Sequence, residues 1–89
     1  QALEVGLINW VVPVAELEKK GREIAAKLAA GPTKSYGRIK KLLNASHSSD
    51  LHDQLALETQ LICESSGTED FKDGITAFLE KRPAQFKGA

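Results

Sequence analysis

The chain has 89 residues, and its 12 basic and 12 acidic side chains cancel to a formal net charge of zero. A chain of this length forms at most one small domain and buries only about 60 to 65% of the surface it exposes when unfolded. The cancelled charge and the lack of any apolar run near the roughly 20 residues of a membrane span predict a cytoplasmic protein whose partners are neither nucleic acid nor a membrane.

The first six residues have the pattern of a helix end closed by Gly6. The chain contains no Met, so we expect a fragment of a longer protein whose upstream part holds the chemistry. The stretch from Leu7 to Val12 is short, rich in β-branched residues and followed by Pro13, which predicts a brief strand or an extended connector. Trp10 within it is expected to pack against a neighbouring element rather than to stack on a ligand.

Two amphipathic helices follow. Apolar residues at helical spacing predict the first from Val14 to about Ala30. Gly31-Pro32 ends it and offers Pro32 as the first residue of the second helix, which is predicted to run to Ala45. The expected inward-facing side chains of the second helix are Tyr36, Ile39, Leu42 and Leu43. The expected outward-facing cations are Lys34, Arg38 and Lys41, a pattern more typical of solvated surface than of a phosphate site.

A third helix is predicted from about Asp50 to Ser66, with Ser48 or Ser49 as its cap. Apolar residues cover most of its circumference, so it needs neighbours on more than one side. They are Leu51, Leu55, Ala56, Leu57, Leu61, Ile62 and Cys63. Glu58 lies inside this apolar arc, where we expect a structural ion pair rather than a catalytic acid. The thiol of Cys63 is expected to be buried rather than nucleophilic, because it has no basic neighbour to lower its pKa.

The stretch from Thr68 to Phe86 combines a helix start, an aromatic face, a basic exit and a stop. Thr68 is the predicted N-cap, and the acidic residues of the first turn complement the helix dipole. Phe71, Ile75 and Phe78 form an arc that is predicted to be buried, with Leu79 on its shoulder. The other side carries Lys72, Asp73, Thr76 and Glu80. Lys81 and Arg82 are predicted in the last turn, and Pro83 stops the helix.

No recognisable catalytic motif accompanies these helices. The sequence has no Gly-rich phosphate loop, no nucleophile elbow and no supported Ser-His-Asp or Cys-His set. His47 and His52 do not share a helix face, so no metal site is expected. The residues alone therefore predict a mainly α structure, with a short extended N-terminal segment followed by about four helices, and no active site.

Four segments carry a resemblance to a known family. They are A-L-E-V-G-L-I-N-W-V-V-P, G-P-T-K-S-Y-G-R-I-K-K-L-L-N, Q-L-A-L-E and T-E-D-F-K-D-G-I-T-A-F-L-E-K-R-P-A-Q-F. In this order they closely resemble the carboxy-terminal part of the enoyl-CoA hydratase/isomerase (crotonase) family, over essentially all 89 residues. The most specific motif comprises Asp70-Phe71, Gly74, Ala77-Phe78, Glu80-Lys81-Arg82 and Phe86. Ala84 departs from it, since the family often has Pro there. The P-T-x-x-Y-G and L-N-A-S elements also resemble the branch that isomerises ring-epoxide phenylacetyl-CoA thioesters.

The resemblance implies a division of labour within a longer enzyme. An upstream core would supply the oxyanion hole and the carboxylates that move protons or water, so residues 1–89 contain no catalytic group. The helices would pack between subunits of a homo-oligomer, a trimer or a hexamer, and lie over an active site. The positions that match Phe78 and Lys81 would touch the acyl or pantetheine portion and the nucleotide phosphates of an acyl-CoA substrate. CoA is then part of the substrate, and no separate cofactor is implied.

Two interpretations of residues 1–89 stand at this point. In the first, they are the C-terminal helical segment of a crotonase-type enzyme, which supplies subunit packing and covers the active site but is inactive alone. In the second, they form a free-standing helical module that binds a protein partner through its surplus apolar surface. An oxyanion-hole Gly pair and an acidic residue upstream would decide for the first. The sequence does not distinguish hydration from isomerisation or other crotonase chemistry.

Overall fold

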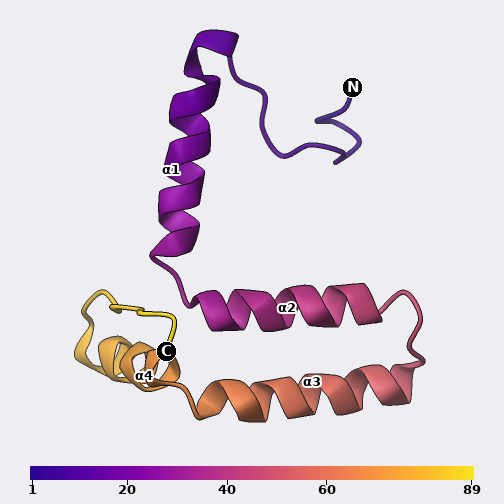
Figure 1. Cartoon of the computed structure of the whole chain (residues 1–89), viewed down its shortest axis with the longest axis vertical. Coiled ribbons are helices and arrows are strands. Elements are labelled where there is room, and N and C mark those ends of the chain that lie inside the picture. The colour runs from indigo at the N-terminus through magenta and orange to yellow at the C-terminus, as the bar shows by residue number, and fades with distance from the viewer.

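The structure is a computed structural model that describes all residues, 1–89, and it contains four α-helices and no strand (Figure 1). A single 3-10 turn, η1 (Val14–Glu16), leads into α1 (Leu17–Ala29). The other helices are α2 (Thr33–Ala45), α3 (Leu51–Ser66) and α4 (Glu69–Glu80). The predicted mainly α fold with about four helices is therefore confirmed. None of these helices has the length and apolar character that crossing a bilayer requires.

The N-terminal residues form the predicted helix end. The Leu7 N–H donates to the carbonyl of Ala2 at 2.9 Å, and the Gly6 N–H donates to Leu3 at 3.1 Å. Gly6 has φ 71°, so this turn is a Schellman motif with glycine in the left-handed position. Residues 7–12 pair with no other strand, so they form the connector and not the strand. Trp10 is more than half exposed and lies over a shallow hollow beside α1.

The joint between α1 and α2 is compact. Gly31 is buried, and a Cβ added there would overlap the Tyr36 side chain, so any other residue would have to displace this ring. Pro32 was predicted to be the first residue of the second helix. It has φ −75° and ψ 80° and instead precedes α2, which begins at Thr33. Because Pro32 lacks an N–H, it adds no unpaired donor of its own at the start of α2.

Helices α2 and α3 lie side by side as an antiparallel hairpin (Figure 1). The Gln54 Nε2 donates to the carbonyl of Leu42 at 3.0 Å, and the Arg38 Nη2 donates to the carbonyl of Glu64 at 3.4 Å. Arg38 also forms an ion pair with the Glu64 carboxylate at 3.6 Å, and its side chain is only 20% exposed. The prediction of Arg38 on the solvated strip was wrong, because a partner on α3 draws it inward.

The cap of α3 also differs from the prediction. Asp50, and not Ser48 or Ser49, accepts the N–H of Asp53 at 2.8 Å through its carboxylate. A carboxylate at this place satisfies an unpaired N–H and complements the helix dipole as well. The helix consequently begins one residue later than expected, at Leu51.

Several residues predicted to be buried are exposed. Ile39, Leu43 and Cys63 are exposed, and so are most apolar residues of α3. Glu58 is exposed and takes part in no ion pair, so the predicted structural pair is absent. Ile39, Leu43, Cys63 and Glu58 are exposed for the same reason: no other element of these 89 residues packs against them.

The chain as a whole has helices but almost no core. Only five of 89 residues are buried, and Leu61 and Ala77 are the buried hydrophobic residues. The radius of gyration is 16.7 Å, whereas a compact domain of this length would have about 12 Å. Figure 1 shows the cause, since α1 projects away from the α2–α3 hairpin. The helices are thus arranged with most of their apolar surface uncovered.

Candidate functional site

The start of α4 is built as the sequence predicts. The Thr68 hydroxyl accepts the N–H of Phe71 at 3.1 Å, so Thr68 is the N-cap. Glu69 in the first turn forms an ion pair with Lys72 at 2.7 Å, and the hydrogen bond from Lys72 lowers the pKa of Glu69. These contacts fix where α4 begins and therefore which residues share its faces.

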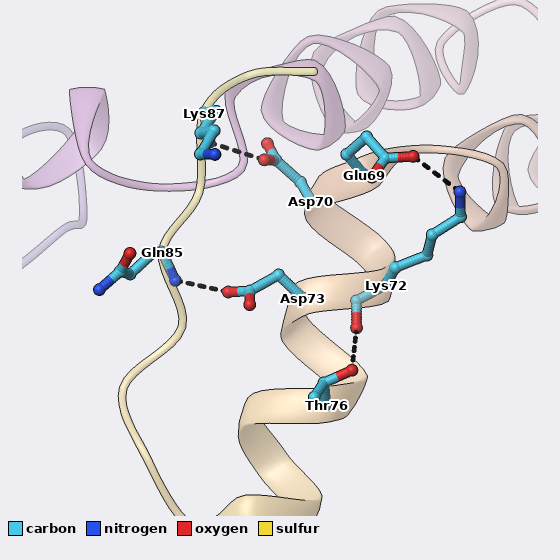
Figure 2. Close-up of a pocket in the computed structure, with 7 residues that line it drawn as sticks. All are labelled: Glu69, Asp70, Lys72, Asp73, Thr76, Gln85 and Lys87. Atoms are coloured by element: carbon cyan, nitrogen blue, oxygen red, sulfur yellow. Dashed lines mark hydrogen bonds and ion pairs between the residues drawn. The ribbon is translucent and has the colours of Figure 1, made fainter.

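One face of α4 is covered by the C-terminal tail, which runs back along the helix (Figure 2). The carboxylate of Asp70 is only 4% exposed and accepts the backbone N–H groups of Lys87 at 2.7 Å and Gly88 at 2.9 Å. Phe86 lies against Gly74, where an added Cβ would be 3.5 Å from the ring. Ala77, on the same face, is 2% exposed. The small residues Gly74 and Ala77 thus let the tail pack close to α4, and Asp70 binds the end of the tail.

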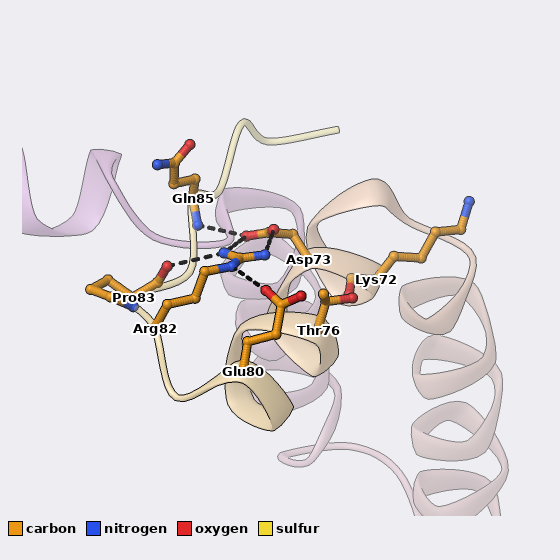
Figure 3. Close-up of polar contacts among 7 residues, drawn as sticks. All are labelled: Lys72, Asp73, Thr76, Glu80, Arg82, Pro83 and Gln85. Atoms are coloured by element: carbon orange, nitrogen blue, oxygen red, sulfur yellow. Dashed lines mark hydrogen bonds and ion pairs between the residues drawn. The ribbon is translucent and has the colours of Figure 1, made fainter.

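An ion pair holds the start of the tail (Figure 3). The Arg82 guanidinium forms a fork on Asp73, with Nη2 to Oδ1 at 2.7 Å and Nη1 to Oδ2 at 3.5 Å. The same carboxylate accepts the N–H of Gln85 at 2.7 Å. Arg82 also donates through Nε to Glu80 at 2.7 Å and through Nη1 to the carbonyl of Pro83 at 3.1 Å. We call Asp73, Arg82 and their shared contacts the Asp73–Arg82 fork.

The fork sets the charge state of Asp73. Hydrogen bonds from Arg82 and from the Gln85 N–H lower the pKa of Asp73 below its ordinary value of 3.8, and the paired carboxylates raise the pKa of Arg82. Since the pKa of Asp73 is lowered on folding, the stabilisation is fully present above the ordinary carboxyl value. It is lost as the pH falls through the lowered pKa. Both partners are therefore charged throughout the neutral range.

The face of α4 next to the one under the tail is an open apolar stripe. Phe71 is 44% exposed, Ile75 is 50% exposed and Phe78 is 82% exposed. The prediction that this arc is buried was wrong for the chain by itself, because the tail covers the Asp70–Ala77 face instead. The stripe, defined by Phe71, Ile75 and Phe78, is consequently available to a ligand or another protein surface.

Lys81 stands at the end of this stripe, beyond the helix. Its backbone is left-handed, with φ 54° and ψ 38°, and its N–H donates to the carbonyl of Phe78 at 3.3 Å. The prediction that Lys81 and Arg82 lie in the last turn was therefore wrong: α4 ends at Glu80, and both residues follow it. The Lys81 side chain is exposed and takes part in no ion pair.

The two predicted site residues thus occupy the same exposed end of α4, but they do not line a pocket. Two hollows lie beside α4: a small one of about 190 Å³ between Phe71, Ile75 and Phe86, and a polar groove of about 340 Å³ on the Asp70–Asp73 side (Figure 2). No apolar residue lines the polar groove, and neither Phe78 nor Lys81 lines either hollow. An exposed aromatic ring and an unpaired ammonium three residues further along the chain can bind an elongated molecule that is apolar at one end and anionic at the other. It offers no group arranged for proton transfer.

Sequence reasoning missed the residues that hold the tail. The signal was present, because Asp70, Asp73, Gly74 and Ala77 recur at helical spacing and so form a second face of α4. Two of them are acidic and two are small, a composition that resembles solvated surface. The tail that supplies the N–H donors is irregular, and periodicity does not reveal its path.

Comparison with known proteins gives a consistent result. The family model described as "Enoyl-CoA hydratase/isomerase" matches residues 1–89. A protein of Rhodobacter capsulatus named "Probable enoyl-CoA hydratase" is 43% identical over 88 residues, which cover 99% of this chain and 34% of the relative. The crystal structure of an enoyl-CoA hydratase from Bacillus anthracis superposes with a TM-score of 0.85 at 38% identity, covering 99% of this chain and 34% of that chain.

The finer resemblance to the epoxide branch receives less support. The 1,2-epoxyphenylacetyl-CoA isomerase of Escherichia coli is 36% identical over 88 residues, covering 99% of this chain and 34% of that protein. This identity is lower than that of the Rhodobacter relative, so it does not assign the branch. The chain spans about a third of the length of the curated relatives that it matches.

Proposed function

The chain belongs to the enoyl-CoA hydratase/isomerase family, and on that premise we propose that it serves a longer enzyme acting on acyl-CoA thioesters. In this proposal residues 1–89 are the C-terminal helical segment, which contributes subunit packing and part of the CoA and acyl site. The oxyanion hole and the proton-transferring groups lie upstream. CoA enters as part of the substrate, and the proposal requires no separate cofactor.

The observation that carries the proposal is the combination at the end of α4. The aromatic ring of Phe78 is 82% exposed, and the ammonium group of Lys81 is unpaired at the end of the same stripe. An acyl-pantetheine chain is largely apolar, and the nucleotide phosphates of CoA are anionic. A compact ammonium on a flexible stem suits phosphate. Phe78 is thus proposed to contact the acyl or pantetheine portion, and Lys81 the phosphates.

The uncovered apolar surface supports the structural half of the proposal. Exposed apolar residues run along α3 and α4, among them Ile62 at 58% exposure and the stripe of α4. Contiguous patches of this kind mark interaction surfaces. We propose that the upstream core and neighbouring subunits of a trimer or hexamer cover them. The match of the family to the whole chain favours this role over a free-standing interaction module, which would use the same surface.

The direct test replaces Lys81 by alanine in the longer enzyme. Lys81→Ala should raise the KM for a CoA thioester several-fold with little change in kcat, because binding common to the ground and transition states is lost. The penalty should shrink for the matching pantetheine thioester, which lacks the nucleotide phosphates. Lys72→Ala is the matched control, since it removes one cation from α4 outside the stripe.

Two results would refute the role of Lys81. Equal losses on both thioesters would show that no nucleotide contact is involved. An unchanged KM on both, together with a lower melting temperature, would assign Lys81 to stability alone. For the segment as a whole, turnover of crotonyl-CoA by the purified 89-residue chain would contradict the proposal that the catalytic groups lie upstream.

A further inference from the structure

The two Schellman turns of this chain use different residues in the same strained position. The N-terminal one places Gly6 at φ 71°, where glycine carries no steric penalty. The turn after α4 has the same two hydrogen bonds, from Lys81 N–H to Phe78 and from Arg82 N–H to Ala77 at 3.0 Å. It places Lys81 at φ 54°, the one positive φ of a non-glycine residue in the chain. A side chain is therefore kept where the backbone alone favours glycine.

Contacts on both sides of Lys81 hold it in this conformation. The residue before it, Glu80, accepts the Nε of Arg82, the residue after it, at 2.7 Å. Arg82 in turn is anchored to the middle of α4 by the Asp73–Arg82 fork and to the tail by the carbonyl of Pro83. Lys81 is thus the unpaired residue between two paired ones. Its backbone is fixed while its ammonium remains free.

We propose that Asp73 and Arg82 are positioning residues for Lys81: the Asp73–Arg82 fork fixes the left-handed turn from which the Lys81 side chain reaches the phosphates of a CoA thioester. This inference rests on the proposed function of Lys81. Neither Asp73 nor Arg82 touches the ligand in this account. The fork acts by keeping Lys81 in a conformation that an L-residue would otherwise leave.

The fork is suited to this task because of its geometry. Two guanidinium nitrogens meet two carboxylate oxygens, so the pair resists rotation as well as separation. A lysine at position 82 would keep the charge but could not form a fork. Asp73 also accepts the Gln85 N–H, which ties the fork to the chain on the far side of Pro83. Replacing Asp73 or Arg82 should therefore destabilise the left-handed turn at Lys81 and not only remove one ion pair.

The test uses steady-state kinetics of the longer enzyme with a CoA thioester and with the matching pantetheine thioester. Asp73→Asn and Arg82→Ala should each raise the KM for the CoA thioester several-fold with kcat retained, and should change the KM for the pantetheine thioester less than twofold. Asp73→Asn combined with Lys81→Ala should be no worse than Lys81→Ala alone, because both act through one contact. Lys72→Ala, which breaks the 2.7 Å Glu69–Lys72 pair on the same helix, should leave the KM unchanged.

Arg82→Lys separates geometry from charge. It should recover less than half of the loss seen in Arg82→Ala, whereas full recovery would overturn the positioning role. If Lys81→Ala raises the KM for the CoA thioester but Asp73→Asn and Arg82→Ala do not, the positioning role is wrong and the proposed function stands. If Lys81→Ala itself has no effect, both are wrong. Equal effects of the fork variants on both thioesters would also overturn the inference, since general loss of structure acts on both substrates.

Discussion

The left-handed backbone at Lys81 favours glycine, whereas the proposed phosphate contact needs the lysine side chain. Replacing Lys81 by glycine should therefore separate the two effects. The residue has φ 54°, so an L-residue there bears a steric cost of about 1 to 2 kcal/mol. Glycine removes that steric cost. Its unfolded backbone is freer than that of alanine, however, so ordering it on folding costs about 0.5 to 1 kcal/mol more in conformational entropy. The lost cation at the helix end removes about 0.3 kcal/mol of dipole stabilisation when exposed.

These contributions predict opposite changes for two substitutions. Lys81→Gly should raise the free energy of unfolding by about 0.5 kcal/mol, whereas Lys81→Ala keeps the strain and should lower it by about 0.3 kcal/mol. In a protein of 150 to 250 residues this difference separates the two melting temperatures by about 2 °C. Both variants lack the ammonium, so both should raise the KM for a CoA thioester by the same factor.

The assay pairs thermal unfolding of the longer enzyme with the KM for one CoA thioester, measured on wild type, Lys81→Ala and Lys81→Gly. A glycine variant that is more stable yet binds the substrate less well would show that the side chain is kept for the ligand. A lower melting temperature for Lys81→Gly than for Lys81→Ala would refute this prediction, because the turn would then not be strained. It is equally refuted if glycine retains the wild-type KM.

Three further predictions concern the packing. Asp70→Asn should lower the free energy of unfolding by about 1 to 3 kcal/mol, because an amide nitrogen then faces a buried N–H donor. Hydrogen exchange of the tail amides should become faster in this variant, and unchanged exchange would contradict the prediction. Gly31→Ala should cost about 1 to 3 kcal/mol by forcing the Tyr36 ring aside, measurable by urea unfolding, and equal stability would show that the ring moves freely. The 89-residue chain should associate at roughly millimolar concentration, and Ile62→Glu should weaken this association more than Lys27→Glu; sedimentation equilibrium that shows one monomeric species would refute the prediction.

Local features of this chain could be predicted from the sequence because their causes are local. The left-handed Gly6, the Thr68 cap and the four helices depend on neighbouring residues and on a 3.6-residue period. Each of these was confirmed. The predicted starts of α2 and α3 were each off by one residue. For α3 the reason is that Ser and Asp are nearly equal as N-caps.

Burial could not be predicted, because it depends on what lies opposite each face. Arg38 was expected in solvent and is drawn in by Glu64 across the hairpin. Cys63 and Glu58 were expected among neighbours that these 89 residues do not contain. On α4, the aromatic arc outranks the acidic face on any hydrophobicity criterion, yet the tail covers the acidic face because Asp70 and Asp73 accept its backbone N–H groups.

Phe78 and Lys81 are proposed to contact a CoA thioester, so the most direct measurement is a crystal structure of the longer enzyme with a bound acyl-CoA. We expect the Lys81 ammonium within about 4 Å of a phosphate oxygen, the range of an ion pair. The Phe78 ring should lie within about 4.5 Å of the acyl or pantetheine chain, the range of apolar contact. A complex in which other residues hold the phosphates, and in which Lys81 and Phe78 both lie beyond those distances from the ligand, would contradict the account.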